Sequence, residues 1–184
     1  MNLLKITLFV FILFGCEQKG IKVQGNMPSH IASEFNSDEA SIERQKEIAQ
    51  LGYIDAIELY CRQRLFGTYG VLGDLSIKPI DNSKVEDVLE LLIAGSKVNA
   101  NCQFMYACVL SGNKTIRGTD DNYEEYIIPE DDDYKYLDIE KAKEFFIKYI
   151  QNPDEKKAPF GYSPDWVNEM INNAFPELLN NDVK

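Results

Sequence analysis

Apolar side chains recur at helical spacing along most of this chain, and glycines interrupt the pattern at short intervals. The alternation of apolar and polar residues that marks a half-buried strand is weak throughout. The clearest apolar stripe has members at i, i+3, i+4, i+7 and i+8, which is one face of an α-helix: Val85, Val88, Leu89, Leu92 and Ile93. The pattern predicts an all-α fold of short helices joined by turns.

Caps and breakers set the expected helix boundaries. A capping box from Ser83 to Glu86 fits the start of the helix with the clearest stripe, and Gly95 fits its end. Ser163 followed by Pro164 is a typical helix start. The expected helices cover about 37–50, 53–65, 83–95 and 98–110, and two more begin at 138 and 163.

The first sixteen residues have the layout of an export signal. The apolar run over residues 6–14 is too short to span a bilayer, because a spanning helix needs about 20 residues. The run ends in Leu13-Phe14-Gly15-Cys16, which resembles the lipobox of bacterial lipoproteins. The resemblance implies that residues 1–15 are removed and that Cys16 carries lipid. Residues 17–18 lack the aspartate of an inner-membrane retention signal, so the expected location is the outer membrane, facing the periplasm.

The rest of the chain divides by composition. Residues 16–36 mix glycine, proline and polar residues without periodicity, which predicts a flexible tether. Residues 37–184 are expected to form one α-helical domain with an acidic insert at 113–137. The formal net charge of −11 disfavours binding to nucleic acid or to anionic lipid headgroups. It favours a basic protein partner, or it only keeps the surface solvated.

Two imperfect repeats cover about residues 40–152. Their elements are Gly52 to Ala56, Leu65-Phe66-Gly67, Gly70-Val71 with Asp74, Ala94-Gly95, Leu110-Ser111-Gly112 and Asp138 to Ala142. These elements resemble the Sel-one-like repeat, a relative of the tetratricopeptide repeat. The resemblance implies antiparallel helical hairpins, stacked as a short solenoid with a concave protein-binding surface. Segments 75–82 and 113–137 depart from the repeat as insertions.

Residues for common catalytic sites are scarce. His30 is the only histidine, and its place in the predicted tether does not suit a nucleophile–histidine pair. No phosphate-binding glycine loop and no cysteine–histidine cluster occurs in the sequence. The chain is therefore expected not to be an enzyme and to need no cofactor or metal. Apart from Cys16, the chain has Cys61, Cys102 and Cys108. Either all three are buried free thiols, or Cys61 pairs with Cys102 or Cys108.

The acidic insert is the strongest candidate for a partner-binding site. It interleaves carboxylates with tyrosines, and tyrosine supplies a large contact area at protein interfaces. A passive solvated loop is one alternative. A cation site is another, although the glycine and terminal glutamate of an EF-hand loop are missing. The candidate binding residues are Tyr123, Glu124, Glu125, Tyr126, Asp131, Asp132, Asp133, Tyr134 and Tyr136.

The lipid anchor and the repeats together resemble periplasmic immunity lipoproteins. Such proteins neutralise toxins that neighbouring bacteria deliver into the periplasm, for example the phospholipase effectors of type VI secretion. The resemblance implies that the chain covers the active site or the membrane-docking face of a basic-surfaced toxin. An envelope scaffold or adaptor lipoprotein is the first alternative, and a hydrolase that uses carboxylates is the second.

Overall fold

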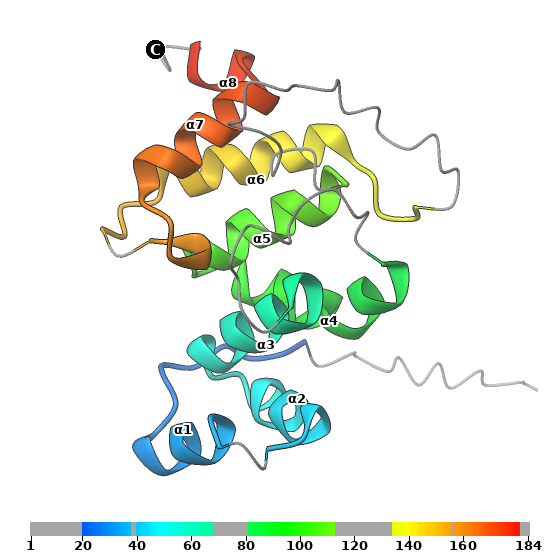
Figure 1. The fold of residues 1–184 in the computed structure, drawn as a ribbon, viewed down its shortest axis with the longest axis vertical. Coiled ribbons are helices and arrows are strands. Elements are labelled where there is room, and N and C mark those ends of the chain that lie inside the picture. The colour runs from blue at the N-terminus through cyan, green and yellow to red at the C-terminus, as the bar shows by residue number, and fades with distance from the viewer. Residues whose placement is uncertain (1–19, 38–39, 68–80, 113–133, 156, 181–184) are drawn as a thin grey trace, which may run out of the picture.

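The regular structure of the chain is helical wherever it is described, which confirms the all-α prediction (Figure 1). The structure, a computed structural model, describes residues 20–37, 40–67, 81–112, 134–155 and 157–180. Within these ranges the strand-type pairing is a single isolated bridge between Gln24 and Tyr53. The helices are α1 (Ser29–Phe35), α2 (Ile42–Gln50), α3 (Ile54–Phe66), α4 (Asn82–Gly95), α5 (Ala100–Leu110), α6 (Ile139–Gln151), α7 (Pro164–Ala174) and the single turn α8 (Glu177–Asn180), with a 3-10 turn η3 at Pro159–Gly161.

The helices pack mainly against their neighbours in the chain. α2 contacts α3, α3 contacts α4, and α4 contacts α5, while α5 and α6 share the most extensive contact (Figure 1). Direct contact between elements further apart in the chain is sparse, and the main examples are α5 with η3 and α3 with α5. One continuous apolar core joins buried residues of the helices from α1 to α7.

α5 is the most buried helix of this arrangement. Each of its residues from Cys102 to Leu110 is buried, as expected for a helix that is apolar all round. The Phe104 ring lies 5.8 Å from the ring of Phe146 and 5.4 Å from that of Tyr149, both on α6. Aromatic contacts of this kind account for much of the close fit between α5 and α6.

Several predicted helix boundaries are confirmed. The Ser163 side chain accepts a hydrogen bond from Trp166 N at the start of α7, and Asp138 accepts one from Lys141 N at the start of α6. α4 ends at Gly95, as predicted.

Two predicted caps are wrong. α4 is capped by Asp81, whose carboxylate accepts both the N–H and the hydroxyl of Ser83 (2.8 Å each). Ser83 is therefore inside the first turn, and its hydroxyl is used as a donor. α2 is capped by Ser41, which accepts from Arg44 N, and not by Ser37.

Residues 20–36, predicted as part of a flexible tether, instead pack against the helices. α1 lies within this segment, and the side chains of Met27 and Phe35 are buried. Residues 20–28, here called the N-terminal strap, run along the α2–α3 turn (Figure 1). Residues 20–28 are held largely by backbone hydrogen bonds, which leave no periodic pattern in the sequence, and α1 is too short to show a clear helical stripe.

The three cysteines within the described ranges, Cys61, Cys102 and Cys108, are buried free thiols. Burial raises the pKa of Cys61 and of Cys102, so both thiols stay protonated. The sequence left open whether Cys61 pairs with Cys102 or Cys108, and in the structure these thiols are unpaired.

Candidate partner-binding surface

The structure describes the C-terminal flank of the acidic insert. Of the predicted binding residues, Tyr134 and Tyr136 belong to this flank. The predicted lipidation site and the other predicted binding residues lie outside the described ranges: Cys16, Tyr123, Glu124, Glu125, Tyr126, Asp131, Asp132 and Asp133.

The residues that follow α5 and those that precede α6 lie next to each other. The hydroxyl of Tyr134 donates to the backbone carbonyl of Val109 (2.7 Å), and Asp138 N donates to the carbonyl of Leu110 (2.8 Å). Gly112, with φ +61°, lies so near Leu137 that a Cβ there would be 3.6 Å from the leucine Cδ1. The two edges of segment 113–133 are therefore held side by side against the last turn of α5.

The same flank is joined to the start of α4. The backbone N–H of Lys135 donates to Asn82 Oδ1 (3.2 Å), and its ammonium group donates to Glu86 (3.2 Å). The rings of Tyr134 and Tyr136 meet edge to face, 5.9 Å apart. The exposed ion pair of Lys135 contributes little by itself, so most of the attachment comes from the two tyrosines and the backbone bonds.

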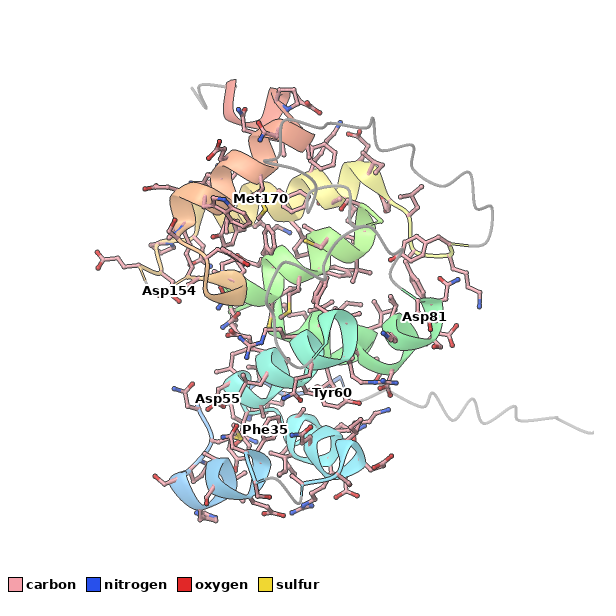
Figure 2. The ribbon with its side chains drawn as sticks, viewed as in Figure 1. Phe35, Asp55, Tyr60, Asp81, Asp154 and Met170 are labelled. Atoms are coloured by element: carbon pink, nitrogen blue, oxygen red, sulfur yellow. The ribbon has the colours of Figure 1, made fainter. Side chains whose placement is uncertain are left out.

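These contacts define one end of the helices, here called the insert end. It consists of residues 81–86, 109–112 and 134–138. Asp81 marks this end in Figure 2, whereas Asp154 lies at the opposite end of the helices. Tyr134 and Tyr136 are half-buried here, and the Tyr134 hydroxyl already has a partner within the protein. Tyr134 thus anchors the flank, and only part of its ring is open to another molecule.

A charged network lies next to the insert end. Asp87 on α4 accepts hydrogen bonds from the Tyr60 hydroxyl and from Arg64 Nε (2.7 Å each), both on α3. Its other oxygen pairs with the ammonium group of Lys46 on α2. The Asp87 side chain is only 20% exposed.

The network lowers the pKa of the Asp87 carboxyl group. Burial alone would raise the pKa of Asp87, but the three hydrogen bonds outweigh burial and hold the pKa at about 2. Both carboxylate oxygens are already occupied by donors, so this group holds three helices together and is not placed for acid–base work. Sequence inspection missed the network because its members come from three separate helices.

Amide side chains gather at the opposite end of the helices. Glu58 on α3 accepts from the side-chain amides of Asn99 (3.1 Å) and Asn101 (2.8 Å), at the start of α5. At the end of α6, the Asn152 amide donates to Gln103 (3.1 Å).

Lys157 closes the carboxyl end of α6. Its ammonium group donates to the carbonyls of Tyr149, Ile150 and Asn152 at 2.8–3.0 Å. A cation is favourable at this end of a helix dipole. Burial lowers the pKa of Lys157.

Within the described ranges, no three histidine, cysteine or acidic side chains are grouped in a way that could hold a metal ion. His30 lies on α1 with its side chain exposed. None of the helices in that part of the chain is long and apolar enough to cross a membrane. Comparison of the chain with protein families, with curated proteins and with solved structures gave no match.

Proposed function

We propose that this protein is a membrane-anchored binding module that neutralises a secreted antibacterial toxin by covering its working surface. The observation that carries the proposal is the insert end. There, an acidic, tyrosine-rich segment begins and ends at adjoining points on a scaffold of packed helices. A long loop positioned by a rigid scaffold is a common arrangement for binding.

The proposed scaffold is a short solenoid of antiparallel hairpins, similar to Sel-one-like repeats. Chain-neighbour packing supports this architecture, because repeat arrays are held together by contacts between adjacent units. The hydrogen bonds between helix ends support it as well. Tyr134, which precedes α6, bonds near the end of α5, whereas Asn152, which follows α6, bonds near the start of α5.

Charge gives the proposed partner its chemistry. Residues 113–133 carry eight acidic and two basic side chains. A segment of this charge speeds the encounter with a basic surface and disfavours acidic ones, and salt weakens the effect. Tyrosines in the same segment supply the contact area that charge alone lacks. Lipid on Cys16 would keep the module in the compartment where the toxin acts.

The first experiment tests protection in cells. A candidate secreted toxin, chosen from the genes beside this one, is exported to the periplasm with and without this protein, and survival is measured. We expect survival only when the protein is present, and Cys16→Ser should weaken protection without reducing the affinity of the purified proteins. Equal killing in both strains would exclude the toxin-neutralising function.

A second experiment tests the insert directly. We expect the triple change Asp131→Asn, Asp132→Asn and Asp133→Asn to raise the Kd for the toxin about tenfold, or about 1.4 kcal/mol, and to make binding less dependent on salt. The matched control neutralises three exposed helix carboxylates, with Glu43→Gln, Glu144→Gln and Glu169→Gln. An equal loss of affinity in both variants would mean that only net charge matters and that the insert is passive.

A further inference from the structure

The N-terminal strap is attached to the helices over most of its length. Gln24 N donates to the carbonyl of Gly52 (2.7 Å), and Ile54 N donates to that of Gly25 (3.2 Å). The Gln24 side chain also donates to the carbonyl of Leu51 (2.5 Å). Figure 1 shows this segment lying along the α2–α3 side of the array.

The end of the strap is held by a carboxylate. Met27 N donates to both oxygens of Asp55, at 2.9 and 3.1 Å, and the Met27 side chain is buried. Ile21 and Val23 also pack against the core with part of their surface. Because Asp55 is in the first turn of α3, the strap is fixed to the same helix that carries Tyr60 and Arg64 of the charged network.

This attachment shortens the reach of the proposed lipid anchor. A free tether over residues 16–36 could extend about 70 Å, at about 3.5 Å per residue. Since Ile21 already packs against the core, only five peptide steps separate it from Cys16, or about 18 Å when fully extended.

We propose that the strap holds the α1–α3 part of the protein against the bilayer surface and keeps α7 and α8 away from it. This inference rests on lipidation of Cys16, which is part of the proposed function. The α1–α3 surface then contacts the lipid headgroup layer, and this contact does not require a pocket that binds a single lipid. α7 and α8 lie at the opposite end of the helices from α1 and α2 (Figure 1). The short connection to the lipid therefore places α1 and α2 near the membrane and α7 and α8 far from it.

The experiment uses the full acylated protein, bound to phosphatidylcholine vesicles that contain a headgroup spin-labelled lipid. A fluorophore is attached at Gln50→Cys, beside the strap, or at Asn173→Cys on α7, both of which are exposed. The native thiols Cys61, Cys102 and Cys108 are buried, so they should not be labelled. We expect several-fold stronger quenching at position 50 than at position 173.

A linker variant supplies the control. A long glycine–serine linker between Lys19 and Gly20 should remove the difference, whereas the same linker after Asn180 should leave it unchanged. Equal quenching at both positions in vesicle-bound protein would overturn the orientation while leaving the anchor intact. Protein that fails to sediment with the vesicles would instead refute the anchor, and the orientation with it.

Discussion

Gly52 has no room for a side chain. Its φ of +94° favours glycine, and a Cβ there would overlap the backbone carbonyl of Lys22 in the strap. Its own carbonyl accepts the hydrogen bond from Gln24 N. Gly52 therefore both forms the turn between α2 and α3 and contacts the strap.

Gly52→Ala can be compared with Gly67→Ala to separate these two roles. Gly67 has a similar φ of +89°, but a Cβ there would meet nothing within 4 Å. Both changes should cost about 1 kcal/mol for backbone strain, and Gly52→Ala should cost a further 1–3 kcal/mol, roughly, for the overlap with the strap. Urea unfolding of the two variants measures the difference. Equal losses of stability would mean that the strap moves aside at no cost.

At the scale of whole helices, Asp87 joins three elements. Its three partners lie on α2 and α3, while Asp87 itself lies on α4. Asp87→Asn leaves Lys46 and Arg64 without their counter-charge. We expect a loss of about 2–3 kcal/mol in the free energy of unfolding, less than for a fully buried pair because the site keeps some exposure. Glu144→Gln, an exposed carboxylate on α6, is the matched control and should have little effect.

The contribution of Asp87 should also depend on pH. Its folded pKa of about 2 is below the ordinary value of about 3.9, so its ionised form stabilises the folded state. That stabilisation is complete above about pH 5 and disappears as the pH falls through about 2. The stability difference between the wild type and Asp87→Asn should therefore shrink between about pH 6 and about pH 3. A difference that stays constant over this range would contradict the assigned pKa.

The helical elements were predictable where one residue carries a local signal. Asp138 and Ser163 cap helices through their own side chains, and Gly95 ends one, so each acts within a few residues of its place in the chain. The cap predicted at Ser83 was wrong because a better acceptor, Asp81, stands two residues before it. α1 was missed because it is short and is held mainly by what lies around it.

The candidate site was less predictable than the helices. The loss of helical pattern after Gly112 and its return at Asp138 placed the insert between α5 and α6. The contacts that hold its edge could not be foreseen. Tyr134 bonds to Val109 and Lys135 to Asn82, which are 25 and 53 residues away in the chain, and such partners depend on how the helices stack.

At the scale of the whole molecule, stability should be divided among neighbouring helices. Ile48 on α2 and Phe146 on α6 are both fully buried, and α3 to α5 lie between their helices (Figure 1). In a stacked array, residues without shared neighbours contribute independently. Ile48→Val combined with Phe146→Leu should therefore lower stability by the sum of the two single changes, within about 0.5 kcal/mol.

A contacting pair supplies the comparison for this double mutant. The rings of Phe104 and Phe146 are 5.8 Å apart, so Phe104→Leu and Phe146→Leu should be coupled by about 0.5–1.5 kcal/mol. Chemical denaturation of the single and double mutants gives both coupling energies. A strong coupling between positions 48 and 146 would mean that stability is not divided among neighbouring helices.

The adjoining edges at Gly112 and Leu137 make the helical scaffold independent of the length of the segment between them. Because these edges already lie in contact, a longer or shorter segment between them need not move α5 or α6. Doubling the length of a connecting segment costs only about 0.6 kcal/mol in closure entropy. A foreign binding segment can therefore be grafted between the same two residues without moving α5 or α6.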